Sequence, residues 1–257
     1  MTNLSFPKCA EAQSTGAYMA GVAYALEQLH SVSNVYTYVD MAHSGWLGWD
    51  SNLNPTVQLF TDLATQAGGF AAIDGFISNT ANTTPTIEPY MTATQMVGGN
   101  PVRSAKYYQW NQYIDEQSYA LAMRTALIAK GYPTTLGVLI DTSRNGWGGS
   151  ARPTGPSTST SLETFVDETR IDRRFHRGNW CNPSGAGLGE RPKPDGASTD
   201  IPNDGGKKFD RMCDPTYTGN ALNGNSPTGA QPDAPLSGQW FATQFAQLVQ
   251  NAYPPVS

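Results

Sequence analysis

Polar and aromatic side chains suited to binding or acting on a ligand follow a strongly β-prone run near residue 40. Residues 35–40 read VYTYVD, so β-branched and aromatic residues lead directly into Asp40, and His43, Trp46 and Trp49 come soon after. Such a run predicts a strand buried on both faces. Sites in parallel α/β sheets form where strands of this kind end. The pattern therefore indicates polar chemistry beside aromatic platforms, or else a strand-to-loop transition whose tryptophans fill a surface groove.

Composition narrows the class of ligand. The formal net charge of -5 and the pI near 5.1 speak against a nucleic-acid partner, which needs a basic face. No apolar run approaches the roughly 20 residues of a membrane helix, so no membrane partner is expected. Only 14% of the 257 residues are charged, while there are 6 Trp and 12 Tyr. This balance suits a neutral, hydroxyl-rich ligand such as a sugar.

The histidines and cysteines do not predict a metal centre. His30, His43 and His176 lie far apart, and no pair of Cys or His residues has the spacing of zinc ligands. We therefore expect no metal and no cofactor. The cysteine count is odd, so at least one thiol remains outside any intramolecular disulfide. The N-terminal residues lack the basic and apolar regions of a signal peptide.

The periodicity of apolar residues predicts alternating helices and strands, which is typical of a parallel α/β sheet or barrel. Beyond Asp141 the composition changes to long loops rich in Gly, Pro, Ser and Thr. The expected strands are 35–40, 75–78 and 136–140. The expected helices are 10–29, one that starts at Asn54-Pro55 and stops at Gly68-Gly69, 110–130, and one capped by Ser237; the expected loops are 79–86, 143–160 and 178–235.

Several long motifs together resemble glycoside hydrolase family 6, and in particular its bacterial cellobiohydrolases. They occur in family order and span nearly the whole chain from Asn3 onward: YVDMAHSGWLGWDSNLNP, GFISNTAN, LIDTSRNGWGG, RIDRRFHRGNWCNPSGAGLGERP and DAPLSGQWF. The resemblance implies a distorted, TIM-like α/β barrel, here incomplete and with long C-terminal loops. It also implies a secreted, exo-acting enzyme that releases cellobiose from cellulose or cello-oligosaccharides with inversion. Inverting sites hold two carboxyl groups about 6.5–9.5 Å apart to admit the attacking water.

The resemblance also implies roles for individual residues that match the family's motifs. Asp40 matches a carboxylate that supports the site electrostatically, Asp195 aligns with the catalytic base, and Arg144 matches a charge partner near that base. Asp141, at the end of the third strand, is either part of the substrate site or a plain strand-end cap. Substrate contacts are implied for His43, Trp46, Trp49, Asn82 and Trp180.

The same resemblance implies a disulfide between Cys181 and Cys213 that clasps a loop over the site. Cys9 matches a cysteine whose usual partner lies in a loop that we do not find here, so Cys9 is expected to be free.

The sequence departs from the family pattern in two places. The family's proton donor, in a motif like EPDSL, and a helper aspartate, in a loop like DRDCA, lie upstream of the first matching segment. A strand and loop like AYVWVKPPGESDG is reduced to PKPDG around Asp195. We therefore expect residues 1–257 to form one partial catalytic-type domain, in which Asp40 would have to act as the acid and hydrolysis is impaired.

Two alternatives follow from these departures: a sugar-binding pseudoenzyme, and an inactive fragment that needs a complementing chain. Three strands cannot close a barrel, so uncovered strand edges would leave the chain open to self-association.

One further run, between Arg170 and Arg177, is rich in arginine. It predicts a surface ion-pair cluster that contributes little to stability.

Overall fold

The structure, a computed structural model, describes residues 7–190, 214–235 and 239–256. Its centre is a 3-stranded parallel sheet in the order β1-β2-β5, made of β1 (Tyr38–Asp40), β2 (Gly75–Ser78) and β5 (Gly137–Ile140). The predicted strands are thus confirmed, although the first begins at Tyr38 rather than at residue 35. Because the strands are parallel, their carboxyl ends lie at one edge of the sheet. The described residues form no closed barrel.

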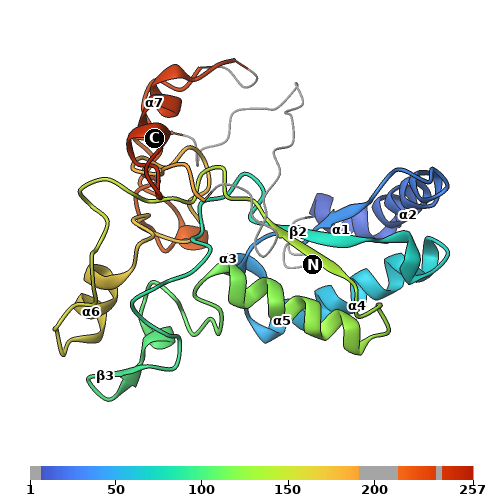
Figure 1. The fold of residues 1–257 in the computed structure, drawn as a ribbon, viewed down its shortest axis with the longest axis horizontal. Helices are drawn as coiled ribbons and strands as arrows, with labels where there is room; N and C mark the ends of the chain where they lie inside the picture. Colours follow the sequence, from blue (N-terminus) through green and yellow to red (C-terminus); the bar gives the residue numbers. More distant parts are fainter. Residues whose placement is uncertain (1–6, 191–213, 236–238, 257) are drawn as a thin grey trace.

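Three helices accompany this sheet: α2 (Ala17–His30), α4 (Asp50–Gln66) and α5 (Glu116–Ala129). Helix α5 contacts β5, and α4 contacts both α2 and α5. Figure 1 shows them at the same end of the molecule as the sheet. Their apolar faces and the central strand bury one core, which provides the main hydrophobic stabilisation of this half. Its members include Leu26, Met41, Phe60, Phe76, Tyr119, Met123 and Leu127.

The other half of the chain holds little regular structure. It contains α6 (Leu162–Thr169), α7 (Ala242–Gln250) and a hairpin of β3 (Met96–Val97) and β4 (Asn100–Pro101), which lie away from the sheet in Figure 1. The 3-10 turns η2 (Val102–Ser104) and η4 (Ala221–Asn223) also belong here. The long loop expected over residues 178–235 is confirmed where the structure describes it, while α6 was not expected.

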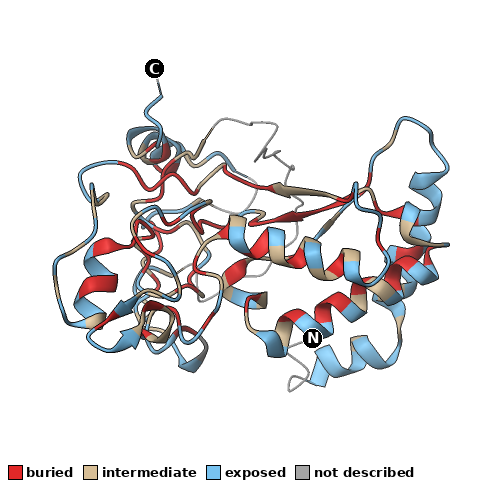
Figure 2. Ribbon diagram, turned by 60° about the horizontal axis from the view of Figure 1, so that its bottom comes forward, coloured by how far each residue is buried: buried red, intermediate tan, exposed pale blue. Residues whose placement is uncertain are grey.

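Several predicted helix boundaries were wrong. The expected helix 10–29 is two helices, α1 (Pro7–Ser14) and α2, because Gly16 between them adopts a left-handed φ of 65°. Helix α1 has no buried residue and is mostly exposed in Figure 2. Helix α4 begins at Asp50, before the expected Asn54-Pro55 start, and keeps Pro55 inside it.

The two later helices also begin further along the chain than expected. Helix α5 starts at Glu116, not near residue 110, because the Asp115 side chain accepts the backbone N–H of Ser118 at 2.9 Å and caps it. Helix α7 begins after Phe241, and the expected cap Ser237 lies outside the described residues.

The first strand is not buried on both faces. Tyr38 is 42% exposed, and Asp40 is exposed as well, because β1 is an edge strand rather than a central one. Only β2, between the other two, is buried along its whole length. The Tyr38 ring lies over the neighbouring strands: a Cβ added at Gly75 would come within 2.4 Å of Tyr38 Cε1.

In the part of the chain that the structure describes, no helix has both the length and the apolar character needed to cross a membrane.

Candidate functional site

The segments that follow β1, β2 and β5 meet at the carboxyl edge of the sheet; we call residues 40–46, 79–84 and 141–145 the strand-end site. Asn79 joins the three segments from a buried position with a left-handed φ of 64°. Its backbone N–H donates to the carbonyl oxygen of Ala42 at 2.8 Å, and its side-chain amide donates to the carbonyl oxygen of Asp141 at 2.9 Å. Asn79 therefore holds the three segments, with the candidate residues that they carry, at one edge of the sheet.

The two strand-end aspartates occupy different environments. Asp40 is exposed and accepts the backbone N–H of Ala42 at 2.7 Å. Asp141 is buried and accepts the backbone N–H of Ala81 at 3.0 Å and of Ser143 at 2.8 Å, one on each carboxylate oxygen. Asp141 thus acts as a strand-end cap, whereas Asp40 keeps solvent access.

Arg144 links the segment that follows β5 to the segment that follows β2. Its guanidinium donates to the carbonyl oxygen of Ala81 and to Oδ1 of Asn182 at 3.4 Å. Burial lowers the pKa of Arg144, and the charge of nearby Asp141 opposes that shift. The arginine remains a cation beside that aspartate.

His43 is a neutral imidazole. Burial and the positive charges of Arg174 and Arg177 lower its pKa to about 3. Its Nδ1 is buried with no hydrogen-bond partner among the described residues. The ring leaves little room at Gly45, where an added Cβ would lie 3.2 Å from the imidazole Cε1. Because a neutral imidazole has one donor and one acceptor nitrogen, it can bond a hydroxyl group in either sense.

The candidate tryptophans fall into two groups. Trp46, in α3 (Ser44–Leu47), is 45% exposed, and Trp180 is 43% exposed. Trp49 is only partly exposed, since its indole N–H donates to the carbonyl oxygen of Gln109 at 2.7 Å. The first two therefore present ring surface to solvent, while Trp49 is anchored to the loop before α5.

A cavity of about 550 Å³ adjoins this anchor point. The side chain of Gln109 lines it and lies 3.1 Å from the His176 ring, which lines it too. Phe175, on the same wall, is 62% exposed. Gln109 therefore links Trp49, through its backbone carbonyl, to the cavity that its side chain lines.

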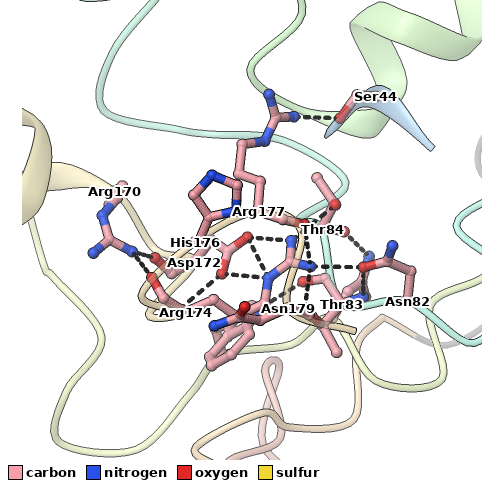
Figure 3. A network of polar contacts seen from close by, with 12 residues as sticks. Ser44, Asn82, Thr83, Thr84, Arg170, Asp172, Arg174, His176, Arg177 and Asn179 are labelled. Carbon is pink, nitrogen blue, oxygen red and sulfur yellow. Dashed lines mark hydrogen bonds and ion pairs between the residues drawn. The ribbon is translucent and has the colours of Figure 1, made fainter. Parts of the chain in front are cut away.

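The run between Arg170 and Arg177 is not a surface cluster, so that prediction was wrong. Arg170, Asp172, Arg174 and Arg177 are only 6%, 2%, 3% and 3% exposed. The three guanidinium groups are buried and bonded: they donate to backbone carbonyls of the run itself and of Asn179, and Arg177 also donates to Ser44 Oγ on another segment (Figure 3). We call residues 170–178 the arginine loop.

The arginine loop contacts the strand-end site at two points. Arg177 Nη2 donates at 2.5 Å to the Oγ of Ser44, which is the residue directly after His43. Arg174 forms a buried ion pair with Asp172, with 2.6 Å between Nη2 and Oδ2, and donates through Nη1 to Asn82 Oδ1 at 2.8 Å. The same Nη1 lies 3.0 Å from the carbonyl oxygen of Asn179, the residue before Trp180.

Two buried glutamates support this network, and the sequence did not point to them. Glu88 accepts the backbone N–H of Ile171 at 3.0 Å, and burial raises its pKa to about 8. Glu116 accepts the backbone N–H of Ser44 at 2.7 Å, and burial raises its pKa to about 7. Nothing in the sequence around these two glutamates marks them as buried.

Some predicted residues cannot be placed. Asp195 and Cys213 lie outside the described residues, so the base assignment and the disulfide stay predictions. Cys9 is free and exposed, as expected. In the described ranges no group of His, Cys, Asp and Glu could hold a metal ion.

The sequence profile named "Glycosyl hydrolases family 6" matches residues 1–252. This chain belongs to glycosyl hydrolase family 6.

Family 6 relatives agree with this assignment. The chain is 50% identical to Exoglucanase A of Cellulomonas fimi over 279 residues, covering 99% of this chain and 32% of that protein. It is 33% identical to a probable 1,4-beta-D-glucan cellobiohydrolase C of Neosartorya fischeri, covering 99% of this chain and 48% of the relative. The chain therefore spans about a third to a half of these relatives.

Solved family 6 structures match the fold. The catalytic domain of Cellulomonas fimi Cel6B has a TM-score of 0.92 at 48% identity, covering 100% of this chain and 62% of that chain. A mutant of the cellobiohydrolase Cel6A from Humicola insolens, in complex with a methyl-tetrathio-cellopentoside, has a TM-score of 0.67 at 28% identity. This match covers 99% of this chain and 60% of the Humicola insolens chain. The family 6 fold thus extends over the arrangement of strands and loops described above.

Proposed function

We propose that this chain binds cello-oligosaccharides at the strand-end site and acts on their β-1,4-glucosidic bonds with inversion, in the exo-acting manner that releases cellobiose. The observation that supports this best is the pair of exposed rings of Trp46 and Trp180. Trp46 follows the neutral His43 by three residues, and Trp180 follows Asn179, whose carbonyl oxygen shares Arg174 Nη1 with the amide oxygen of Asn82. Aromatic faces and uncharged hydrogen-bonding groups suit a neutral sugar. Two relatives are named as an exoglucanase and a probable 1,4-beta-D-glucan cellobiohydrolase, and both names refer to glucan substrates.

Binding is tested by titrating cellotetraose into the wild-type chain and into Trp46→Ala by calorimetry. We expect the variant to bind about tenfold more weakly or worse, because a stacked apolar surface is lost. Trp240→Ala is the matched control, since Trp240 is 71% exposed but packs on Phe245 beside α7. Equal affinity of wild type and Trp46→Ala would remove Trp46 from the site.

Hydrolysis by this chain should be slow, because its described carboxyl groups are poorly suited to protonate a leaving oxygen. Inversion needs one protonated acid and one carboxylate base. Glu88 and Glu116 have the raised pKa of an acid, but they are only 4% and 0% exposed and bond backbone N–H groups. We therefore assign Asp40 as the acid and Asp195 as the base. General acid catalysis typically contributes about 10²–10⁴-fold, which sets the scale of the loss.

The test compares turnover of cellotetraose with turnover of an aryl cellobioside, whose good leaving group needs little protonation. We expect very low turnover of cellotetraose and a smaller deficit on the aryl substrate. Asp40→Asn should reduce turnover of cellotetraose further, and Asp62→Asn on exposed α4 surface provides a matched control. Turnover of cellotetraose within tenfold of a full-length homologue would prove the impairment wrong.

Two alternatives give different outcomes in the same experiments. A sugar-binding pseudoenzyme would bind cellotetraose and release no product from either substrate. A fragment that needs a complementing chain would gain activity when a chain carrying the family's donor segment is added.

We also propose that the chain acts outside the cell and that Cys181 pairs with Cys213, both by family resemblance. A disulfide of this kind is typically worth about 2–4 kcal/mol. Mass spectrometry of a non-reduced digest should find these two peptides linked and exposed Cys9 alkylated. A link from Cys9 to either other cysteine would contradict the pairing.

A further inference from the structure

The side-chain amide of Asn82 has only one orientation that its neighbours accept. Its Oδ1 accepts the backbone N–H of Thr83 at 2.6 Å and the Arg174 guanidinium at 2.8 Å. Both partners can only donate, so a flipped amide would place its NH₂ group against two donors. The oxygen must therefore face Arg174, and in Figure 3 the amide nitrogen points away from it. Within the described ranges this nitrogen has no acceptor.

Arg174 itself is held on every side. Its Nε lies 3.0 Å from Asp172 Oδ1, its Nη2 lies 2.6 Å from Asp172 Oδ2, and the same Nη2 lies 3.0 Å from Thr84 Oγ1. Nη1 is shared between Asn82 and the carbonyl oxygens of Arg177 and Asn179. The side chain is 0% exposed. A planar guanidinium fixed by this many bonds cannot turn away from Asn82.

We propose that Arg174 is a positioning residue that fixes the Asn82 amide so that its NH₂ group is presented as a hydrogen-bond donor to an oxygen of the bound sugar. This role rests on the proposed function of the strand-end site. Sugar hydroxyl, ring and glycosidic oxygens all accept hydrogen bonds, so a fixed donor suits them. Without Arg174 only the Thr83 N–H would hold the amide oxygen, so the amide would be less restricted and binding would have to restrict it further.

A double-mutant cycle tests this role, with cellotetraose affinity measured by calorimetry. Arg174→Lys keeps a positive charge opposite Asp172 but cannot bond Asp172, Thr84 and Asn82 together. We expect Arg174→Lys and Asn82→Ala each to weaken binding about tenfold, the scale of one hydrogen bond, and the double variant to bind no worse than Asn82→Ala alone. Arg173→Lys should bind like wild type, because in the described part of the chain Arg173 bonds Asp167 and the carbonyl oxygen of Arg170 and has no bond to Asn82 or Arg174.

The outcomes separate this inference from the proposed function. If wild type binds and Trp46→Ala weakens binding, the function stands, and additive effects in the cycle or unchanged affinity of Arg174→Lys would overturn the role of Arg174. If wild type does not bind, both are overturned.

A second variant covers the case in which Arg174→Lys does not fold. Asn82→Asp keeps the oxygen that Arg174 and Thr83 bond and replaces only the NH₂ group with a second oxygen. We expect it to fold like wild type and to lose at least about tenfold in affinity. Wild-type affinity of Asn82→Asp would show that this NH₂ group donates to no sugar oxygen.

Discussion

Arg177 Nη2 lies 2.5 Å from Ser44 Oγ, although the two residues are 133 positions apart in the chain. The same nitrogen donates to the carbonyl oxygen of Tyr113 at 3.2 Å. The backbone N–H of Ser44 in turn donates to Glu116 Oε1 at 2.7 Å. Ser44 is therefore the point at which the arginine loop, α3 and α5 are joined.

Replacing this hydroxyl should destabilise the fold. Ser44→Ala leaves the buried Arg177 guanidinium with one acceptor fewer, and we expect the free energy of unfolding to fall by about 1–3 kcal/mol. Urea denaturation measures the change. Ser51→Ala, at an exposed position of α4, is the control and should change stability by less than about 0.5 kcal/mol. Equal effects of the two substitutions would show that the Ser44 bond contributes nothing.

Glu116 should make stability depend on pH. Its folded-state pKa of about 7 is above the usual 4.5, so the unfolded chain releases this proton first. Its contribution is therefore fully present below pH 4.5 and is lost as the pH rises through about 7. Relative to Glu116→Gln, the free energy of unfolding of wild type should fall by on the order of 3 kcal/mol between pH 4.5 and 8. Denaturation of both proteins across this range is the measurement.

Two other groups test the sign of that effect. Glu88→Gln should remove a similar contribution whose window extends to about pH 8. His43 acts in the opposite direction, because its folded-state pKa of about 3 means that stability is lost as the pH falls below 6.5. A wild-type stability that rises relative to Glu116→Gln above pH 4.5 would contradict the buried, protonated state of Glu116.

The contact between Tyr38 and Gly75 should not tolerate a side chain on β2. A Cβ at Gly75 would lie 2.4 Å from the Tyr38 ring and 2.7 Å from the carbonyl oxygen of Gly137. Gly75→Ala should therefore cost about 1–3 kcal/mol, measured as a fall in Tm. Gly21→Ala in α2 has no atom within 4 Å of the new Cβ, so it should be neutral or stabilising by up to about 1 kcal/mol. A neutral Gly75→Ala would mean that β1 moves away from β2 at little cost.

The open edge of β1 should allow self-association. Among the described residues β1 pairs only with β2, and Tyr36 just before it is 73% exposed. We expect wild type to form dimers or larger species in sedimentation runs, and Tyr36→Lys to shift it toward monomer, because a lysine at an edge disfavours pairing. Tyr18→Lys makes the same change at an equally exposed position of α2. An equal effect of the two variants would place the contact elsewhere.

The sequence was sufficient to predict the three strands and the aspartates at the ends of the first and third, for a local reason. Runs such as residues 75–78 carry their own β preference, and Asp40 and Asp141 follow such runs directly. Which strand is central is not a local property, so the partial exposure of Tyr38 could not be read from its neighbours.

The burial of the arginine loop depends on contacts that no sequence window contains. Arg174 forms a hydrogen bond with Asn82, which is 92 positions away in the chain. Glu88 accepts one from Ile171, which is 83 positions away. One signal was present: every basic residue between 170 and 177 other than His176 is an arginine, which pairs with carbonyl groups when buried far better than lysine does. The start of α5 could also have been predicted, because aspartate is a preferred N-cap residue and Asp115 directly precedes Glu116 in the first turn.

The arginine loop has a consequence for the order in which the chain folds. It holds no helix or strand, and side-chain bonds to residues far away in the chain fix its position. Contacts of such long sequence separation form only after the segments between them have been brought together, which slows their formation. We expect the sheet and its helices to protect their amides from hydrogen exchange early in refolding, and residues 170–178 to gain protection in a later phase. The surroundings of the strand-end site would then be completed last, by a segment that has no helix or strand of its own.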